Sequence, residues 1–274
     1  MSAQPRSPLH EAATWTAAAA GYAQSVEPLT RPFAGPTLDL VGLAPGNHGT
    51  RLLDVAAGTG VVALEAARRG AAVVATDFAP GMLDELRRRA AEERLDVRAE
   101  LRDGQDLGFD DGSFELTTSA FGLIFFPAPA AGLAELHRVL RPGGRVAIAS
   151  WDLAAFGIPQ LIGATLARVA PGLPPPPPPP WAPLGEPIGL GEALRAAGFS
   201  HVGVHPVTRH QCIADPGSFF RHVPDWAPGL RPLLAGLTVD QGDMAADTFA
   251  DLLAAHSSEQ GLPASALVAV GTRD

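Results

Sequence analysis

The fold of this chain is constrained most by a short apolar stretch that ends in an acid. A glycine-containing turn follows this stretch and leads into a helix. Residues 51–55 are mainly apolar, Gly58 and Gly60 follow, and helix-forming residues continue to position 69. Glycine adopts turn conformations that bulkier residues rarely reach, and a helix that begins there presents unpaired N–H groups and the positive end of its dipole. The segment therefore predicts a strand, a tight turn and a helix whose start can hold a phosphate or a carboxylate.

The same alternation recurs up to Trp151 and predicts successive βα units of a parallel sheet. Pro80 suits the first turn of a helix, and Gly70 lies where a helix ends before a strand. We expect helices at 60–69, 80–93 and 129–140, and strands at 51–55, 72–76, 96–100, 113–118 and 144–150.

Outside this core the pattern changes. Residues 11–26 predict a helix that Pro28 and Pro32 end, and this helix is a candidate lid. Seven consecutive prolines, 174–180, predict a stiff polyproline II loop that acts as a spacer. Beyond them we expect a helix at 189–197, a strand near 201–213, a helix around 244–257 and a final strand at 265–271.

Composition excludes some classes of function. The chain is 46% apolar and 18% charged, enough for a large core, and its net charge of -9 gives no general attraction to nucleic acid or anionic lipid. Cys212 is the only cysteine, and no run approaches roughly 18 uninterrupted apolar residues. We therefore expect a cytoplasmic monomer or homodimer that acts on a small molecule and binds neither nucleic acid nor a membrane.

Four ordered motifs support a more specific interpretation. Asp54 ends the first strand before the glycine turn, Asp77 ends the second, residues 102–107 precede the fourth, and residues 136–144 lead into the fifth. Together they resemble the class I S-adenosylmethionine-dependent methyltransferases, specifically the group similar to the ubiquinone and menaquinone biosynthesis enzymes, most strongly over residues 50–150. The family's first loop reads acid-x-Gly-x-Gly-x-Gly, and here Ala56 replaces the first glycine.

The resemblance implies a fold and a domain organisation. The fold is a doubly wound, Rossmann-like α/β structure with a mostly parallel seven-stranded sheet, an antiparallel last strand, and helical lid and cap segments. We expect one methyltransferase domain over residues 1–274. Its parts are a helical lid (1–45), the cofactor-binding core (46–150), a cap with the sixth strand (151–260) and the last strand (261–274).

The resemblance also implies S-adenosylmethionine as the cofactor and assigns residues to it. Asp54 and the turn at 56–60 would hold its amino-acid end, Asp77 would accept hydrogen bonds from both ribose hydroxyls, and Phe78 and Met82 would pack against adenine. Asp103 would accept from the adenine amino group, and the N–H of Gly104 would donate to a ring nitrogen. The full predicted set is Tyr22, Asp54, Ala56, Gly58, Thr59, Gly60, Asp77, Phe78, Met82, Asp103, Gly104, Gln105 and Ser119.

Methyl transfer from a sulfonium mainly needs an acceptor aligned behind the methyl group. A hydroxyl acceptor would also use a base, for which His222 and His210 are the candidates. Ser119, Phe121, Phe125 and the region 151–226 are expected to shape the acceptor pocket. Oxygen, nitrogen and carbon acceptors stay open, with a natural product or a quinone-like molecule suggested by the resemblance alone.

Two other functions compete. The dinucleotide fingerprint of a nicotinamide-dependent oxidoreductase is also satisfied, by Gly58-x-Gly60-x-x-Ala63 and by Asp77 after it. Against this function, the negative charge of Asp54 would lie near the pyrophosphate. A protein of this fold could also catalyse a cyclisation or act as a binding module. No metal is expected, because strand alternation in 201–205 directs the valines toward the core and the imidazoles outward.

Overall fold

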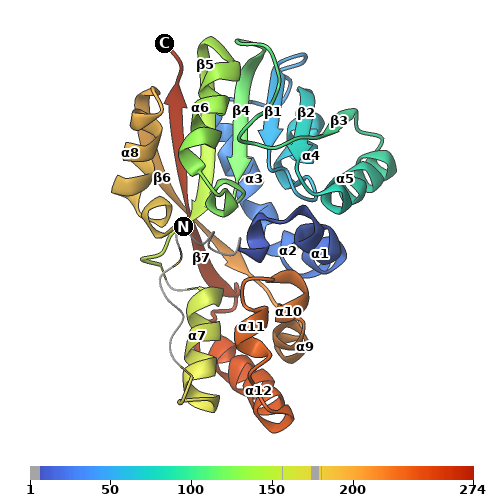
Figure 1. Ribbon diagram of the computed structural model, residues 1–274, viewed down its shortest axis with the longest axis vertical. Coiled ribbons are helices and arrows are strands. Elements are labelled where there is room, and N and C mark those ends of the chain that lie inside the picture. The colour runs from blue at the N-terminus through green and yellow to red at the C-terminus, as the bar shows by residue number, and fades with distance from the viewer. Residues whose placement is uncertain (1–6, 156, 174–178, 180) are drawn as a thin grey trace, which may run out of the picture.

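The computed structural model describes residues 7–155, 157–173, 179 and 181–274, and the strands it describes form one seven-stranded sheet (Figure 1). Strands β1 to β5 pair in parallel, whereas β7 runs antiparallel to both of its neighbours, β5 and β6. This confirms the predicted doubly wound, Rossmann-like α/β fold with an antiparallel last strand. Across the sheet the order is β3 (Val97–Leu101), β2 (Ala72–Asp77), β1 (Arg51–Val55), β4 (Phe114–Ala120), β5 (Leu140–Trp151), β7 (Leu262–Thr272) and β6 (Ser200–Gln211).

Helices cover both faces of the sheet, so the central strands are apolar on both sides. One face packs against α3 (Ala34–Val41), α4 (Val61–Arg68) and α5 (Pro80–Glu93), and the other packs against α6 (Pro129–Val139) and α8 (Pro187–Ala196). Leu52 belongs to the first of these two cores and Leu53 to the second, as expected for successive residues of a strand. The predicted helix at 80–93 is confirmed at both ends.

The N-terminal segment is more helical than its prolines predicted. It contains the short 3-10 helix η1 (Pro8–His10), α1 (Ala12–Ser25), α2 (Glu27–Thr30) and η2 (Arg31–Phe33), which leads into α3. Pro28 and Pro32 lie in the first turns of α2 and η2, where a helix needs no N–H from the residue. The prolines therefore start new short helices instead of ending helical structure, and α1 packs against α5.

A helical lobe lies beyond the ends of β6 and β7 (Figure 1). It has its own apolar core, made by α7 (Ile158–Val169), α9 (Pro216–Arg221), α10 (Val223–Trp226), α11 (Arg231–Leu234) and α12 (Val239–His256). Helix α12 begins five residues before the predicted start at 244, because Thr238 and Gln241 form a capping box. Apart from Pro179, the proline run 174–180 lies outside the described residues.

The fifth strand also begins earlier than predicted. We expected a helix to position 140 and a strand from 144, but α6 ends at Val139 and β5 starts at Leu140. Pro142 lacks a donor and disfavours helical backbone in the residue before it, so this segment is extended. The β4–β5 register then shifts between Phe114 and Leu116. Two further 3-10 helices, η3 (Leu123–Phe125) and η4 (Ala182–Gly185), connect the elements of this region.

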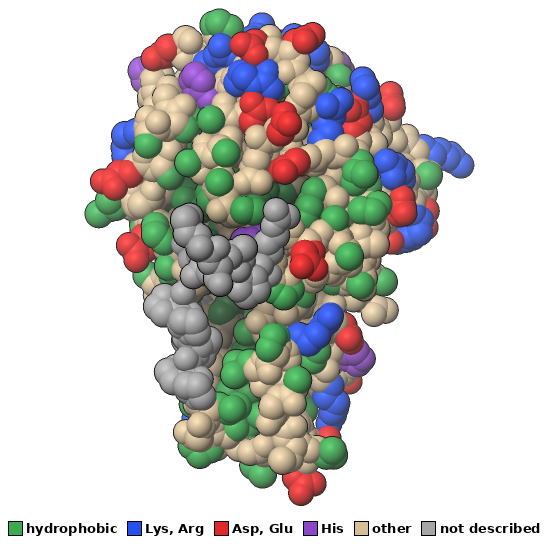
Figure 2. Space-filling model, viewed as in Figure 1, with side chains coloured by type: hydrophobic (Ala, Val, Ile, Leu, Met, Phe, Trp, Pro, Cys, Tyr) green, Lys and Arg blue, Asp and Glu red, His purple; other side chains and the backbone are tan. Residues whose placement is uncertain are grey.

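Surface and membrane properties follow from the same description. On the face shown in Figure 2, acidic and basic side chains are interspersed over the sheet-bearing half. Among the residues that the structure describes, none of the helices combines the length and the apolar character needed to cross a bilayer.

Candidate functional site

A cavity opens beyond the carboxyl ends of β1, β2 and β4, where open α/β sheets bind ligands. The empty volume of the cavity, including the space at its opening to solvent, is about 1060 Å³. Most of the predicted cofactor residues line it: Tyr22, Asp54, Ala56, Gly58, Thr59, Asp77, Phe78, Met82, Asp103, Gly104 and Gln105. Gly60 and Ser119 are not in its wall, because Gly60 caps α4 and Ser119 is fully buried beneath the turn that follows β4.

The glycine turn has the tight, left-handed backbone that its glycines permit. Ala56, Gly58 and Gly60 all have left-handed backbone, with φ of 54°, 55° and 93°. Gly60 must also lack a side chain, because a Cβ there would lie 2.8 Å from Cγ of Leu86. At Ala56 the same conformation costs about 1–2 kcal/mol, because a Cβ crowds the following carbonyl oxygen.

Ala56 in turn depends on a glycine across the cavity wall. A Cβ at Gly122 would lie 2.5 Å from Cβ of Ala56 and 3.0 Å from its carbonyl oxygen. The same position would be 3.3 Å from Oγ of Ser119, a buried hydroxyl with no hydrogen-bond partner among the described residues. The alanine that replaces the family's first glycine is therefore accommodated by the glycine at 122.

Asp54 is a buried carboxyl at the end of β1. It is 2% exposed, and one of its oxygens accepts a 2.7 Å hydrogen bond from Oγ1 of Thr118. Burial raises the pKa of Asp54 to about 7; hydrogen bonds from Thr118 and the backbone of Ala63 oppose the rise, and the charge of Asp77 adds to it. A cationic group placed beside Asp54 would therefore restore its ionised form.

Asp77 holds the glycine turn against the end of β2. Its two carboxylate oxygens accept 2.9 Å hydrogen bonds from the N–H groups of Gly58 and Ala79. Burial raises the pKa of Asp77, and these hydrogen bonds oppose the rise. Because a carboxylate oxygen has more than one acceptor position, both oxygens can still accept from a pair of hydroxyls in the cavity.

Aromatic side chains from the N-terminal segment cover this cavity. The ring centroid of Trp15 lies 6.3 Å from that of Tyr22 and 4.8 Å from that of Phe125, and Phe78 and Met82 belong to the same cluster. Burial raises the pKa of Tyr22 well above its ordinary value, and the charges of Asp77 and Glu27 add to the effect. The tyrosine hydroxyl therefore remains a donor, and α1, the predicted lid, lines the cavity. Trp15 was not predicted, although it lies seven residues before Tyr22 and so on the same helix face.

The loop after β3 forms another part of the wall. Oδ1 of Asp103 accepts from the backbone N–H of Gln105 at 2.9 Å, and the Gln105 side chain accepts from the N–H of Ala128 at 2.8 Å. A Cβ at Gly104 would collide with the ring of Phe126, so this position tolerates only glycine. Phe126 is a wall residue that no local pattern indicated, because it meets Gly104 from a different loop.

The end of β4 presents an aromatic ring to the cavity. Phe121 has left-handed backbone, with φ of 59°, which is rare and strained for a bulky residue. Its ring stacks on Trp151 with centroids 4.3 Å apart, and Phe33 packs edge-on against both rings. The structure thus brings Phe121 and Phe125 to the cavity. Of the other residues expected to shape the acceptor pocket, Ser119 and the described part of the region 151–226 are not in the cavity wall.

The structure does not bring the two predicted bases to the cavity. His210 is exposed on β6; His222 is exposed beside α9, with its Nδ1 2.7 Å from the carbonyl oxygen of Ser218. His222 and Cys212 line a second groove, between the residues where α1 meets α2 and the segment 212–222. Their assignment as bases stays a prediction, and the histidine that lines the main cavity is His10.

The two histidines at the start of β6 lie as the strand pattern predicts. Val202 and Val204 pack against the core, whereas His201 and His205 are exposed. Within the described ranges, no group of three or more His, Cys, Asp or Glu side chains is arranged to hold a metal ion.

Comparison with known proteins adds sequence relatives. A family model described as a methyltransferase domain matches residues 52–144. The demethylmenaquinone methyltransferase of Clavibacter sepedonicus is 50% identical over 106 residues, covering 38% of this chain and 42% of that protein. The nocamycin O-methyltransferase of Saccharothrix syringae is 35% identical over 193 residues, covering 63% of this chain and 66% of that protein.

An uncharacterized protein of Mycobacterium tuberculosis is 37% identical over 153 residues, covering 56% of this chain and 53% of that protein. The chain thus spans about half the length of the first curated relatives that it matches. Among solved structures, the [4+2]-cyclase SpnF superposes with a TM-score of 0.54 at 22% identity, covering 88% of this chain and 80% of that chain. At this identity the likeness shows the fold alone.

Proposed function

We propose that this chain, whose residues 52–144 form a class I S-adenosylmethionine-dependent methyltransferase domain, binds that cofactor and transfers its methyl group to a small molecule. The observation that carries the proposal is the placement of Asp77. Its carboxylate is fixed by the glycine turn and by Ala79, lines the cavity, and keeps acceptor capacity on both oxygens. That geometry suits the two hydroxyls of a ribose.

The remaining walls suit the other parts of the cofactor. The turn at 56–60 and the start of α4 offer backbone N–H groups to a carboxylate, while Asp54 can receive the ammonium of the same amino-acid end. Phe78, Met82 and Phe126 provide apolar surface for adenine. The buried carboxyl of Asp54 beside the turn favours this arrangement over a pyrophosphate, whose negative charge it would repel.

The bound cofactor supplies an electrophilic methyl group, and the protein aligns the acceptor and excludes water. Trp15 and Tyr22 cover the cavity, and Phe121 with Phe125 offers an apolar surface to an acceptor. Relatives named for demethylmenaquinone and for nocamycin support a small-molecule acceptor. If the acceptor is a hydroxyl, His10 is the first base to test, ahead of His210 and His222, because it lines the cavity.

Titration calorimetry tests the cofactor assignment. S-adenosylmethionine and S-adenosylhomocysteine should bind the wild-type protein, NAD should not, and Asp77→Ala should abolish binding. Asp84→Ala is the matched control, because Asp84 is an exposed carboxylate on α5 that pairs only with Arg87 among the contacts described. A preference for NAD, or full binding by Asp77→Ala, contradicts the assignment.

The reaction itself needs a second assay. Incubation with S-adenosylmethionine and candidate acceptors should yield S-adenosylhomocysteine and an acceptor heavier by one methyl group, both detected by mass spectrometry. Tight cofactor binding without any such transfer across a broad acceptor panel would favour a binding module instead.

A further inference from the structure

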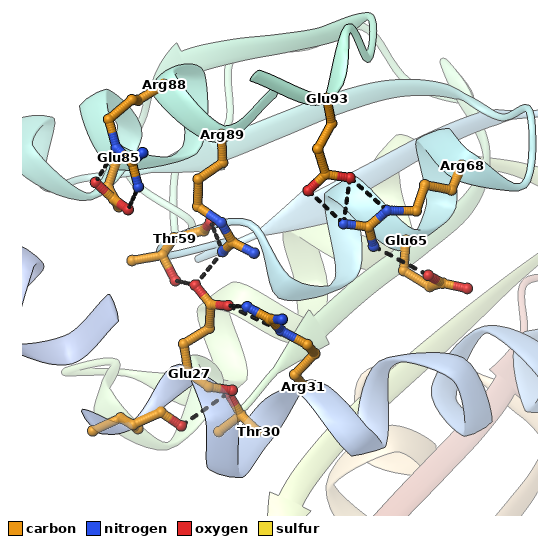
Figure 3. Close-up of polar contacts among 11 residues, drawn as sticks. Glu27, Thr30, Arg31, Thr59, Glu65, Arg68, Glu85, Arg88, Arg89 and Glu93 are labelled. Carbon is orange, nitrogen blue, oxygen red and sulfur yellow. Dashed lines mark hydrogen bonds and ion pairs between the residues drawn. The ribbon is translucent and has the colours of Figure 1, made fainter. Parts of the chain in front are cut away.

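A buried carboxylate joins the lid to the rest of the cavity. Glu27 is the first residue of α2 and is only 1% exposed. It accepts a hydrogen bond from Oγ1 of Thr59 at 3.0 Å, and it pairs with Arg31 and with Arg89 (Figure 3). Burying an ionised carboxylate is costly unless charged and hydrogen-bonding partners surround it, so these contacts stabilise Glu27 inside the protein.

The partners of Glu27 come from two other elements that form the cavity. Thr59 belongs to the glycine turn and lines the cavity. Arg89 lies on α5, whose first turn carries Met82, and its guanidinium also donates to the carbonyl oxygen of Thr59 at 2.9 Å. The Arg89 side chain is 11% exposed, whereas that of Arg31 is 60% exposed. The buried contact to Arg89 and Thr59 is therefore the one that connects the segments.

The predicted lid, α1, is connected directly to the helix that carries Glu27. Trp15 and Tyr22 on α1 line the cavity, and α2 with Glu27 follows α1 after a single residue. Moving α1 away pulls on α2, and therefore on the contacts of Glu27 with Arg89 and Thr59. Separating a buried carboxylate from its partners is strongly unfavourable, since it leaves charge uncompensated.

We propose that Glu27 is a positioning residue that latches the lid over the cavity and sets the rate at which the cofactor is exchanged. The inference rests on the proposed function for the identity of the molecule exchanged. Its structural part, the latch between α2, the glycine turn and α5, is independent of that identity.

Glu27→Gln tests the latch because the amide keeps the size of the side chain and one oxygen for Thr59, but removes the charge that Arg89 requires. Release of S-adenosylhomocysteine, followed by stopped-flow Trp fluorescence, should be about tenfold faster or more, because the buried ion pair no longer opposes lid opening. Hydrogen exchange of the α1 amides should accelerate to a similar degree, while exchange in β4 and β5 stays as in the wild type.

The matched control is Glu92→Gln. Glu92 pairs with Arg88 at 2.5 Å on α5, close to Arg89 in sequence, but the two side chains are 59% and 54% exposed and the pair stays within one helix. Exposed pairs of this kind contribute little. The control should therefore release the ligand, and exchange its α1 amides, as the wild type does.

A double-mutant cycle separates a latch from general destabilisation. If Glu27 and Arg89 act as one unit, the variant with both Glu27→Gln and Arg89→Gln releases the ligand no faster than the faster single variant. Wild-type release and wild-type α1 exchange in Glu27→Gln would overturn the proposal, and so would multiplicative effects in the double variant.

Two further arms keep the test decisive. If Glu27→Gln does not fold, Arg89→Lys takes its place. It keeps the charge but loses the planar guanidinium, whose Nη1 donates to both Glu27 and the carbonyl oxygen of Thr59, and faster release is again expected. If the wild type binds no S-adenosylhomocysteine, the proposed function fails. The α1 exchange rates of the ligand-free protein then decide the latch alone.

Discussion

Asp54→Asn should make the ligand-free protein more stable while removing its ability to bind the cofactor. The wild-type carboxyl is 2% exposed, and burial raises its pKa from 3.8 to about 7. Asparagine has nearly the same shape as the protonated acid and is never charged, and its side chain retains an oxygen that can accept from Thr118. The substitution therefore removes the cost of an ionised, buried group.

The magnitude follows from the size of the pKa change. Below about pH 4 the group is protonated in both the folded and the unfolded chain, so the substitution should change stability little. From there to about pH 7 the unfolded chain ionises and the folded chain does not, so wild-type stability falls as pH rises. Above pH 7 the full penalty is present, on the order of 4 kcal/mol, at about 1.4 kcal/mol per pKa unit.

Urea denaturation between about pH 4 and pH 8 measures this directly. The free energy of unfolding of Asp54→Asn should exceed that of the wild type most at about pH 8, and the gap should close on acidification. Asp84→Asn, at an exposed carboxylate, is the control. Calorimetry with S-adenosylmethionine should show lost affinity in the same Asp54 variant. The reasoning is refuted if Asp54→Asn is less stable at every pH, or if the gap is independent of pH.

The contact between Ala56 and Gly122 gives two further predictions. Gly122→Ala should lower the free energy of unfolding by about 1–3 kcal/mol in thermal denaturation, because its Cβ overlaps that of Ala56. The control is Gly163→Ala in α7, where a Cβ meets open space. Equal melting temperatures for Gly122→Ala and the wild type would refute the overlap. Ala56→Gly should raise the free energy of unfolding by about 1 kcal/mol, because glycine adopts the left-handed backbone at this position without steric strain. An unchanged urea midpoint would show that Ala56 is not strained.

Features whose signal is local in sequence could be predicted. The strand, turn and helix at 51–68 follow from a few adjacent residues, and Asp77 is placed by the end of its own strand. The parallel order then brings Asp54, Asp77 and the glycine turn to one edge of the sheet. The early start of α12 also had a local signal, the pair Thr238 and Gln241, which the sequence interpretation did not use.

Features that depend on distant contacts could not be predicted. Glu27 lies 62 residues from Arg89, and nothing around either residue distinguishes it from the surface ion pairs of α5. Phe126 meets Gly104 only because two loops converge above the sheet. His222 follows Phe219, Phe220 and Arg221 in the sequence, a local pattern that suits a pocket. The fold nevertheless directs it to the groove lined by Cys212, because α9 packs against α12.

A crystal structure of the protein with S-adenosylhomocysteine tests the central claim most directly. The account predicts the ribose hydroxyls on the Asp77 carboxylate, the amino-acid end at the turn of residues 56–60, and the nucleoside beneath Trp15 and Tyr22. Density for the ligand in the groove lined by Cys212 and His222, or a ribose that makes no contact with Asp77, would contradict it.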